Sequence, residues 1–146
     1  MAVSRVPDAE GCIDFKCATD LSACQYHLVK LSAANTVAIA DANGDAVVGI
    51  LMNAPNGSTS GTNPNNTTAK VGCIPGYVYP CYAGAAVAAV YTALVPDGSG
   101  HAIGASDNDV VCAVNLTTAG ASGDLMDVMW RTPDTVSNVS KLTDFS

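Results

Sequence analysis

From Gln25 onward, the chain alternates between short apolar runs and clusters of turn-forming residues. The first runs are Tyr26–Leu31, Asn35–Ala40 and Val47–Met52, and the last two flank Asp41–Asp45, which contains an Asn-Gly pair. Runs of this length predict β-strands, and an Asn-Gly turn between two of them predicts a hairpin. The sequence holds 23 Ala and 17 Val but only eight Leu, so small and β-branched side chains must build the core. We therefore predict an all-β fold, a compact antiparallel β-sandwich or barrel with at most one short helix.

The 146 residues favour a single domain with two distinct ends. Residues 1–24 mix charges, Pro and Gly without a sustained period, and we predict an extended N-terminal arm or irregular strand there. A β domain over 25–131 and a polar tail over 132–146 follow. Within the domain, Asn53–Thr68 consists almost entirely of Pro, Asn, Gly, Ser and Thr, which predicts a long exposed loop. Ala83–Val95 combines helix-favouring Ala with strand-favouring Val and Thr, and both interpretations stay open.

The charge of the chain excludes several classes of partner. Six Lys and Arg against 13 Asp and Glu give a net charge of −7. Nucleic-acid binding requires clustered cations that neutralise phosphates, so we expect no such partner. The longest uncharged apolar stretch, Ala83–Val95, has 13 residues, against roughly 20 for a bilayer-spanning helix, so we expect no membrane insertion. No apolar run follows Arg5, and the first residues are unlike a secretory signal.

The six cysteines show no spacing that is diagnostic of a metal or redox site. No Cys-x-x-Cys pair occurs, and the two histidines lie far from any close pair of cysteines, which disfavours zinc. Buried free thiols that pack as small hydrophobic groups are one interpretation. The other is disulfide formation outside a reducing cytosol, with the pairs Cys12–Cys24 and Cys73–Cys81 as candidates.

We find no motif that predicts catalysis. His27 and His101 are the available neutral-pH bases, but neither lies in a nucleophile signature. Asp41–Asp45 resembles the start of a calcium loop, yet Ala46 and Met52 stand where that loop requires Gly and Glu. The remaining paired aspartates lie beside turn residues, where they commonly bond to backbone N–H groups. We therefore expect a protein that is not an enzyme and that needs no cofactor or metal.

Four segments carry a resemblance to a known family. They are Leu21–Leu31, Ala46–Leu51, Ala83–Ala89 and Ala121–Val128. Together they resemble the capsid decoration (cement) proteins of tailed bacteriophages, over roughly residues 20 to 130. This resemblance implies a structural protein that binds the major capsid protein on the outside of the head, forms a homo-oligomer (a trimer by preference) and resides in the host cytoplasm during assembly.

Two sets of residues are candidates for contact within such a role. We predict that the irregular N-terminal segment lies along the major capsid protein, with Arg5 as an anion anchor. The capsid-binding candidates are Val3, Arg5, Val6, Ile13 and Phe15. Because aromatic residues are enriched at interface cores, four tyrosines are candidates for an oligomer interface, with ordinary packing as the alternative. They are Tyr77, Tyr79, Tyr82 and Tyr91.

A secreted carbohydrate-binding or adhesive β-sandwich is the alternative from another class. The six cysteines and the Asn/Thr-rich loop motivate it. In that hypothesis, Trp130 and the tyrosines stack on sugar rings.

Overall fold

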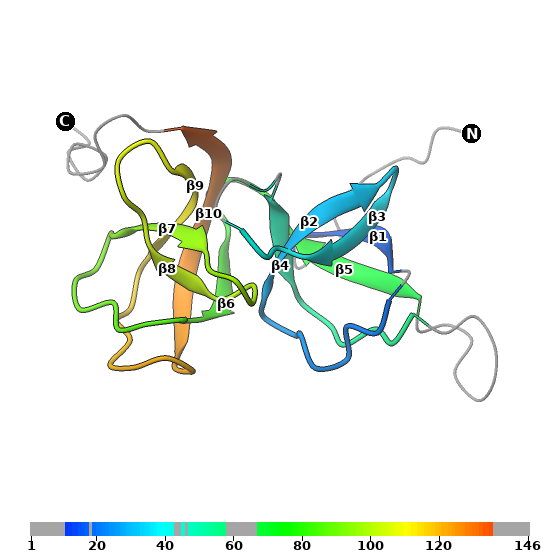
Figure 1. Ribbon diagram of the computed structural model, residues 1–146, viewed down its shortest axis with the longest axis horizontal. Helices are drawn as coiled ribbons and strands as arrows, with labels where there is room; N and C mark the ends of the chain where they lie inside the picture. The colour runs from blue at the N-terminus through cyan, green and yellow to red at the C-terminus, as the bar shows by residue number, and fades with distance from the viewer. Residues whose placement is uncertain (1–10, 18, 43–44, 46, 58–66, 136–146) are drawn as a thin grey trace.

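The computed structural model describes residues 11–17, 19–42, 45, 47–57 and 67–135. Over these ranges it contains ten β-strands and no helix, which confirms the predicted all-β class. The strands are β1 (Cys12–Cys17), β2 (Leu28–Ala33), β3 (Thr36–Ile39), β4 (Val47–Leu51), β5 (Thr68–Gly72), β6 (Val78–Tyr82), β7 (Ala93–Pro96), β8 (Ala102–Gly104), β9 (Val110–Asn115) and β10 (Leu125–Thr135). Figure 1 shows β1–β5 and β6–β10 as two adjacent bodies. The described part of the chain contains no helix that could span a bilayer.

The first body is a closed barrel with the strand order β1-β3-β2-β4-β5. β2 and β3 form a hairpin whose turn residue Asn35 has a φ of 59°, which Asn tolerates well. β4 pairs with β2 and not with β3, so the hairpin predicted across Asp41–Asp45 is wrong. A turn signal marks where the chain bends but does not specify the strand with which the next run pairs. The described part of this turn is held by the Asp45 carboxylate, which accepts hydrogen bonds from the N–H groups of Asp41 and Ala42.

The N-terminal segment enters this barrel directly. β1 runs antiparallel to β5 and parallel to β3, so it is hydrogen-bonded along both edges. Of residues 1–24, for which we predict an arm or an irregular strand, Cys12–Cys17 forms a strand that is a regular member of the barrel, while residues 1–10 lie outside the described ranges. Here Phe15 and Cys17 contribute to the barrel core, and Asp14 and Lys16 are exposed. The charged side chains of this segment therefore form the exposed face of an amphipathic strand.

The second body is a sheet with the order β6-β10-β9-β7-β8. A parallel bridge between Ala83 and Ala102 connects the residue after β6 to β8, so this sheet curls back on itself. β6 is an end strand of the order, as Pro80 predicted, because proline has no N–H group to donate to a neighbouring strand. β10 continues to Thr135, so the polar tail expected from residue 132 begins later.

The ambiguous segment Ala83–Val95 is neither a helix nor a continuous strand. It forms bridges at Ala83 and Val87 and turns at Tyr91, whose φ is 62°, before β7 begins. The buried side chain of Asn115 holds this turn in place. Its carbonyl oxygen accepts a hydrogen bond from the Thr92 N–H group, and its amide donates to the carbonyl oxygens of Ala89 and Thr117.

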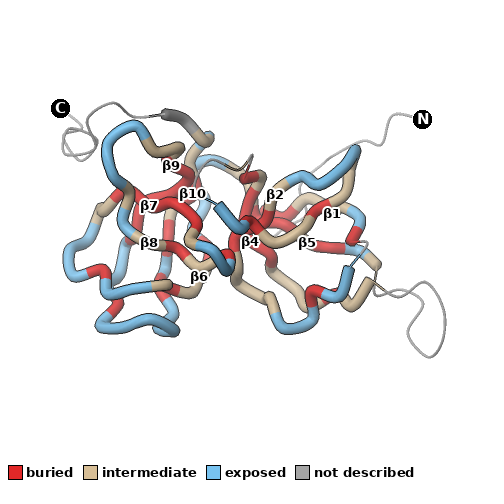
Figure 2. The backbone as a smooth tube through the Cα atoms, in the orientation of Figure 1, coloured by how far each residue is buried: buried red, intermediate tan, exposed pale blue. Residues whose placement is uncertain are grey.

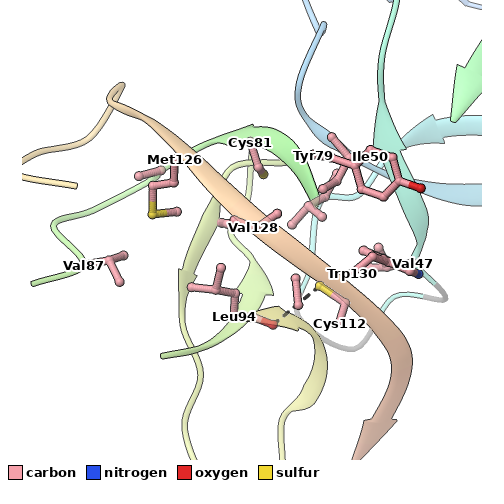
Figure 3. Close-up of a cluster of buried hydrophobic side chains, with 14 of the residues drawn as sticks. Val47, Ile50, Tyr79, Cys81, Val87, Leu94, Cys112, Met126, Val128 and Trp130 are labelled. Carbon is pink, nitrogen blue, oxygen red and sulfur yellow. Dashed lines mark hydrogen bonds between the residues drawn. The ribbon is translucent and has the colours of Figure 1, made fainter. Parts of the chain in front are cut away.

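Two groups of buried side chains stabilise the fold, as the red segments of Figure 2 show. The smaller group fills the barrel and includes Val29, Leu51 and Val71. The larger group joins the two bodies, because Val47 and Ile50 of β4 belong to it together with residues of β6–β10 such as Trp130. Figure 3 shows Val47 beside Trp130 and Ile50 beside Tyr79. Since burial of apolar surface is the main stabilising term, this shared core makes the two bodies one structural unit.

Candidate functional site

Of the predicted capsid-binding residues, two lie in the described part of the chain. Val3, Arg5 and Val6 lie outside the described residues. Ile13 and Phe15 are half-buried in β1, and Phe15 packs against the core of the barrel. Its side chain therefore supports the fold and does not belong to an extended capsid-binding arm.

The four candidate tyrosines differ in burial and position. Tyr79 is only 1% exposed, so it is excluded from any surface contact. Its hydroxyl donates to the carbonyl oxygen of Gly11 at 2.7 Å, and its ring packs on Gly72, where a Cβ would lie 2.5 Å from the ring. Burial raises the pKa of this hydroxyl. Tyr77 is 49% exposed and stacks on Tyr79. Tyr91 occupies the turn before β7, and Tyr82 is the last residue of β6.

The cysteines do not form the candidate disulfides. Cys24 and Cys81 are free thiols, so neither the Cys12–Cys24 nor the Cys73–Cys81 pair exists in this structure. Cys81 is fully buried in the shared core, and this burial raises its pKa. Burial also raises the pKa of Cys112 to about 12. A buried thiol with a raised pKa is unreactive and acts as a small apolar side chain.

Two histidines from different bodies meet at the junction between the barrel and the second sheet. The ring centroids of His27 and His101 lie 4.5 Å apart. Tyr82 packs on both, with centroid distances of 5.7 Å to His27 and 6.3 Å to His101. Tyr26 lies 6.1 Å from Tyr82. We call these four rings the junction cluster.

Backbone hydrogen bonds fix the junction cluster from both sides. The Leu28 N–H group donates to the Gly100 carbonyl oxygen at 2.7 Å, and the Tyr82 N–H group donates to the Tyr26 carbonyl oxygen at 3.1 Å. Gly100 has a φ of +79°, and a Cβ there would lie 2.8 Å from the Ile39 side chain. Glycine is therefore required where the β7–β8 turn meets the barrel.

The chemistry of the junction cluster is that of a proton-sensitive contact. Desolvation, and to a smaller extent the neighbouring His101, lower the pKa of His27. The Asp97 carboxylate lies 3.7 Å from the Nδ1 atom of His101 and also accepts the His101 N–H hydrogen bond. No group of three or more His, Cys, Asp or Glu side chains among the described residues could hold a metal ion. The sequence identified both histidines but could not show that they meet.

A second surface feature lies on the outer side of the second sheet. Burial alternates along β6 and along β10, so one set of side chains enters the core and the other faces outward. The outward set is mostly apolar. We define the β6/β10 outer face as Val78 and Pro80 of β6, Leu125, Asp127 and Met129 of β10, and Leu116, which follows β9. Tyr82, at the end of β6, packs instead on the histidines of the junction cluster. The sequence separated Leu125, Asp127 and Met129 from Met126, Val128 and Trp130, and the charged Asp127 was the signal that could have identified the first set as the exposed one.

Comparisons with known proteins identify a fold neighbour. No family model matches the sequence, and no curated protein matches it. Among solved structures, the N base of head fiber gp8.5 of bacteriophage phi29 is similar, with a TM-score of 0.53 and 14% sequence identity. The similarity covers 84% of this chain and 95% of that chain. At such low identity it shows a shared fold: the chain is an all-β protein whose overall arrangement resembles that of the fiber base.

Proposed function

We propose that this chain is a structural protein of a phage head, located on the outside of the shell, where it acts as a decoration (cement) protein. The observation that carries the proposal is the fold shared with a phage head fiber base over nearly the full length of both chains. The resemblance of four sequence segments to decoration proteins supports the same role independently of the structure.

The physical character of the chain is consistent with this role. Its buried thiols are unreactive and its histidines lie at an internal junction, so we propose adhesion without catalysis or a cofactor. A net charge of −7 favours solubility of the free protein in the host cytoplasm before assembly. In this proposal the partner is the major capsid protein, and the copies on the head associate as a homo-oligomer, preferentially a trimer. Many small interfaces then reinforce the shell together.

The carbohydrate-binding alternative loses its main residue in this structure. Trp130 is 2% exposed and belongs to the shared core, so it cannot stack on a sugar ring. Of the four candidate tyrosines, Tyr79 is buried as well.

The test of the proposed function is accessibility on intact particles. Antibodies raised against the purified protein are applied to virions of the phage that encodes it and detected by immunogold microscopy. We expect labelling over the heads of intact particles. Labelling confined to tails, or to particles only after disruption, would refute an exterior location on the head.

A further inference from the structure

We infer that the β6/β10 outer face is the docking surface for the shell, and that it receives an apolar surface carrying a Lys or Arg side chain opposite Asp127. This inference rests on the proposed function and names the partner chemistry of that function. It is carried by the register of β6 and β10, by the exposure of apolar side chains there, and by the position of one charge.

The register places the outward side chains in rows across the two strands. Val78 lies opposite Met129, and Tyr82 lies opposite Leu125. Val78, the first residue of β6, is 51% exposed, and Leu125, the first residue of β10, is 48% exposed. Contiguous apolar exposure of this kind marks interaction surfaces.

Asp127 occupies the row between these two pairs. It lies opposite Pro80 on β6, and its carbonyl oxygen accepts the N–H hydrogen bond of Leu116, the residue after β9. Leu116 is also exposed, so apolar side chains surround the carboxylate. Neither Arg131 nor any other described cation forms an ion pair with Asp127. A carboxylate that no described cation neutralises, within an apolar face, predicts a cation on the partner, because an apolar or an acidic partner surface would leave its charge uncompensated.

The same charge argues against a second copy of this chain as the occupant. A two-fold contact centred on the face brings two Asp127 carboxylates together. Two carboxylates at the centre of the contact repel each other, whereas a shell surface with a Lys or Arg at that position is attracted.

The experiment measures binding to phage heads that lack the protein, by co-sedimentation at increasing protein concentration. The double variant Val78→Thr/Leu125→Thr replaces two exposed apolar side chains with Thr, which is polar and suits a strand. It should weaken binding by about tenfold or more, as loss of apolar interface contacts does. Asp127→Lys should weaken binding more than Asp127→Asn does. The matched controls are Leu31→Thr, at an exposed apolar position on the barrel, and Asp107→Lys, in the exposed turn after β8; both should bind as wild type does.

The salt dependence separates the charge from the apolar contacts. Raising the ionic strength should weaken binding of the wild-type protein, and it should weaken binding of Asp127→Asn much less, because the screened attraction is already absent. Circular dichroism verifies that each variant is folded. An equal salt dependence in the two proteins would refute the pairing of Asp127 with a cation.

The remaining outcomes distinguish the inference from the proposed function. If wild-type protein binds heads and the face variants bind equally well, the docking surface is wrong while the exterior role stands. If wild-type protein does not bind heads at all, the proposed function fails and the inference fails with it. If the variants bind heads normally but lose self-association in sedimentation velocity, the occupant is a second copy of the chain and the inference is overturned.

Discussion

At the scale of single residues, two buried or half-buried polar side chains decide how loops meet the sheets. Asn115 is the one fully buried polar side chain of the described core, and all its hydrogen bonds go to the backbone of neighbouring segments. His27 lies at the contact between the barrel and the second sheet. Each residue therefore gives a prediction that a simple account of apolar packing would not make.

Replacing Asn115 with Ala should destabilise the protein by about 2–4 kcal/mol, because three backbone hydrogen bonds are lost and the buried groups stay unpaired. Urea unfolding followed by circular dichroism measures this change. Thr118→Ala, at an exposed position of the same loop, is the control and should be close to neutral. Surface substitutions ordinarily change stability by no more than about 0.5 kcal/mol. A loss within that range for Asn115→Ala would contradict the stabilising role of its three hydrogen bonds.

The junction cluster predicts a pH dependence of stability. The pKa of His27 in the folded protein lies below its ordinary value of 6.5, so the unfolded chain binds more protons below that pH. The free energy of unfolding should therefore fall as the pH drops from 7 through 6.5 towards the folded pKa. The neighbouring His101 also lowers the pKa of His27, whereas the Asp97 carboxylate raises it.

Comparison of the wild type with His27→Gln measures this contribution. Thermal unfolding between pH 7 and pH 5 should show a smaller loss of stability in the variant, which has no proton to bind at this position. Identical pH profiles for the two proteins would mean that the His27 contact does not contribute.

At the scale of strands, the sequence predicted the kind of element better than its partners. The alternation of Leu125–Trp130 and the edge position of Pro80 were visible from residue types alone. The pairing of β4 with β2 was not, because registers over such short strands depend on which apolar faces meet in the core. β1 was misjudged because its outer charges concealed the inward side chains of Phe15 and Cys17.

For the candidate site too, the sequence predicted individual residues better than their contacts. Sequence alone identified His27, His101 and Tyr82 as residues of interest, but their contact depends on a turn after β7 reaching the start of β2. For β10, the charged Asp127 was the signal in the sequence that favours the set Leu125, Asp127 and Met129 as the exposed one, but the alternation alone did not show what covers either face. Tertiary packing determines both the contact between the two histidines and the exposed side of β10.

Truncation of the N-terminus tests the status of β1. Deleting residues 1–15 removes four residues of β1 and their pairing with β5, which opens the barrel, so we expect loss of the cooperative thermal transition. Deleting residues 1–10 leaves β1 intact and should preserve the transition. A folded 1–15 deletion with unchanged melting temperature would contradict the place of β1 in the barrel.

At the scale of the whole molecule, the shared core predicts that the barrel and the second sheet unfold together. The chain contains a single tryptophan, Trp130, and it lies where the two bodies meet. Its fluorescence should therefore change at the same denaturant concentration as the far-ultraviolet circular dichroism signal does. Two separated transitions would show that the bodies are independent units.

Removing the centre of this core should affect both bodies. Trp130→Ala leaves a large cavity and should cost about 3–5 kcal/mol of stability. Circular dichroism should then report one transition at lower denaturant concentration. Tyr77→Ala, at a half-exposed aromatic position near the same edge, provides the comparison and should cost much less.

The central claim is that this chain binds the outside of a phage head at a fixed set of positions. Saturating stripped heads with purified protein and weighing them by native mass spectrometry counts the bound copies directly. We predict a plateau at a constant number of copies per head, reached cooperatively or not. Absence of added mass, or uptake that rises with concentration without a plateau, would contradict the account.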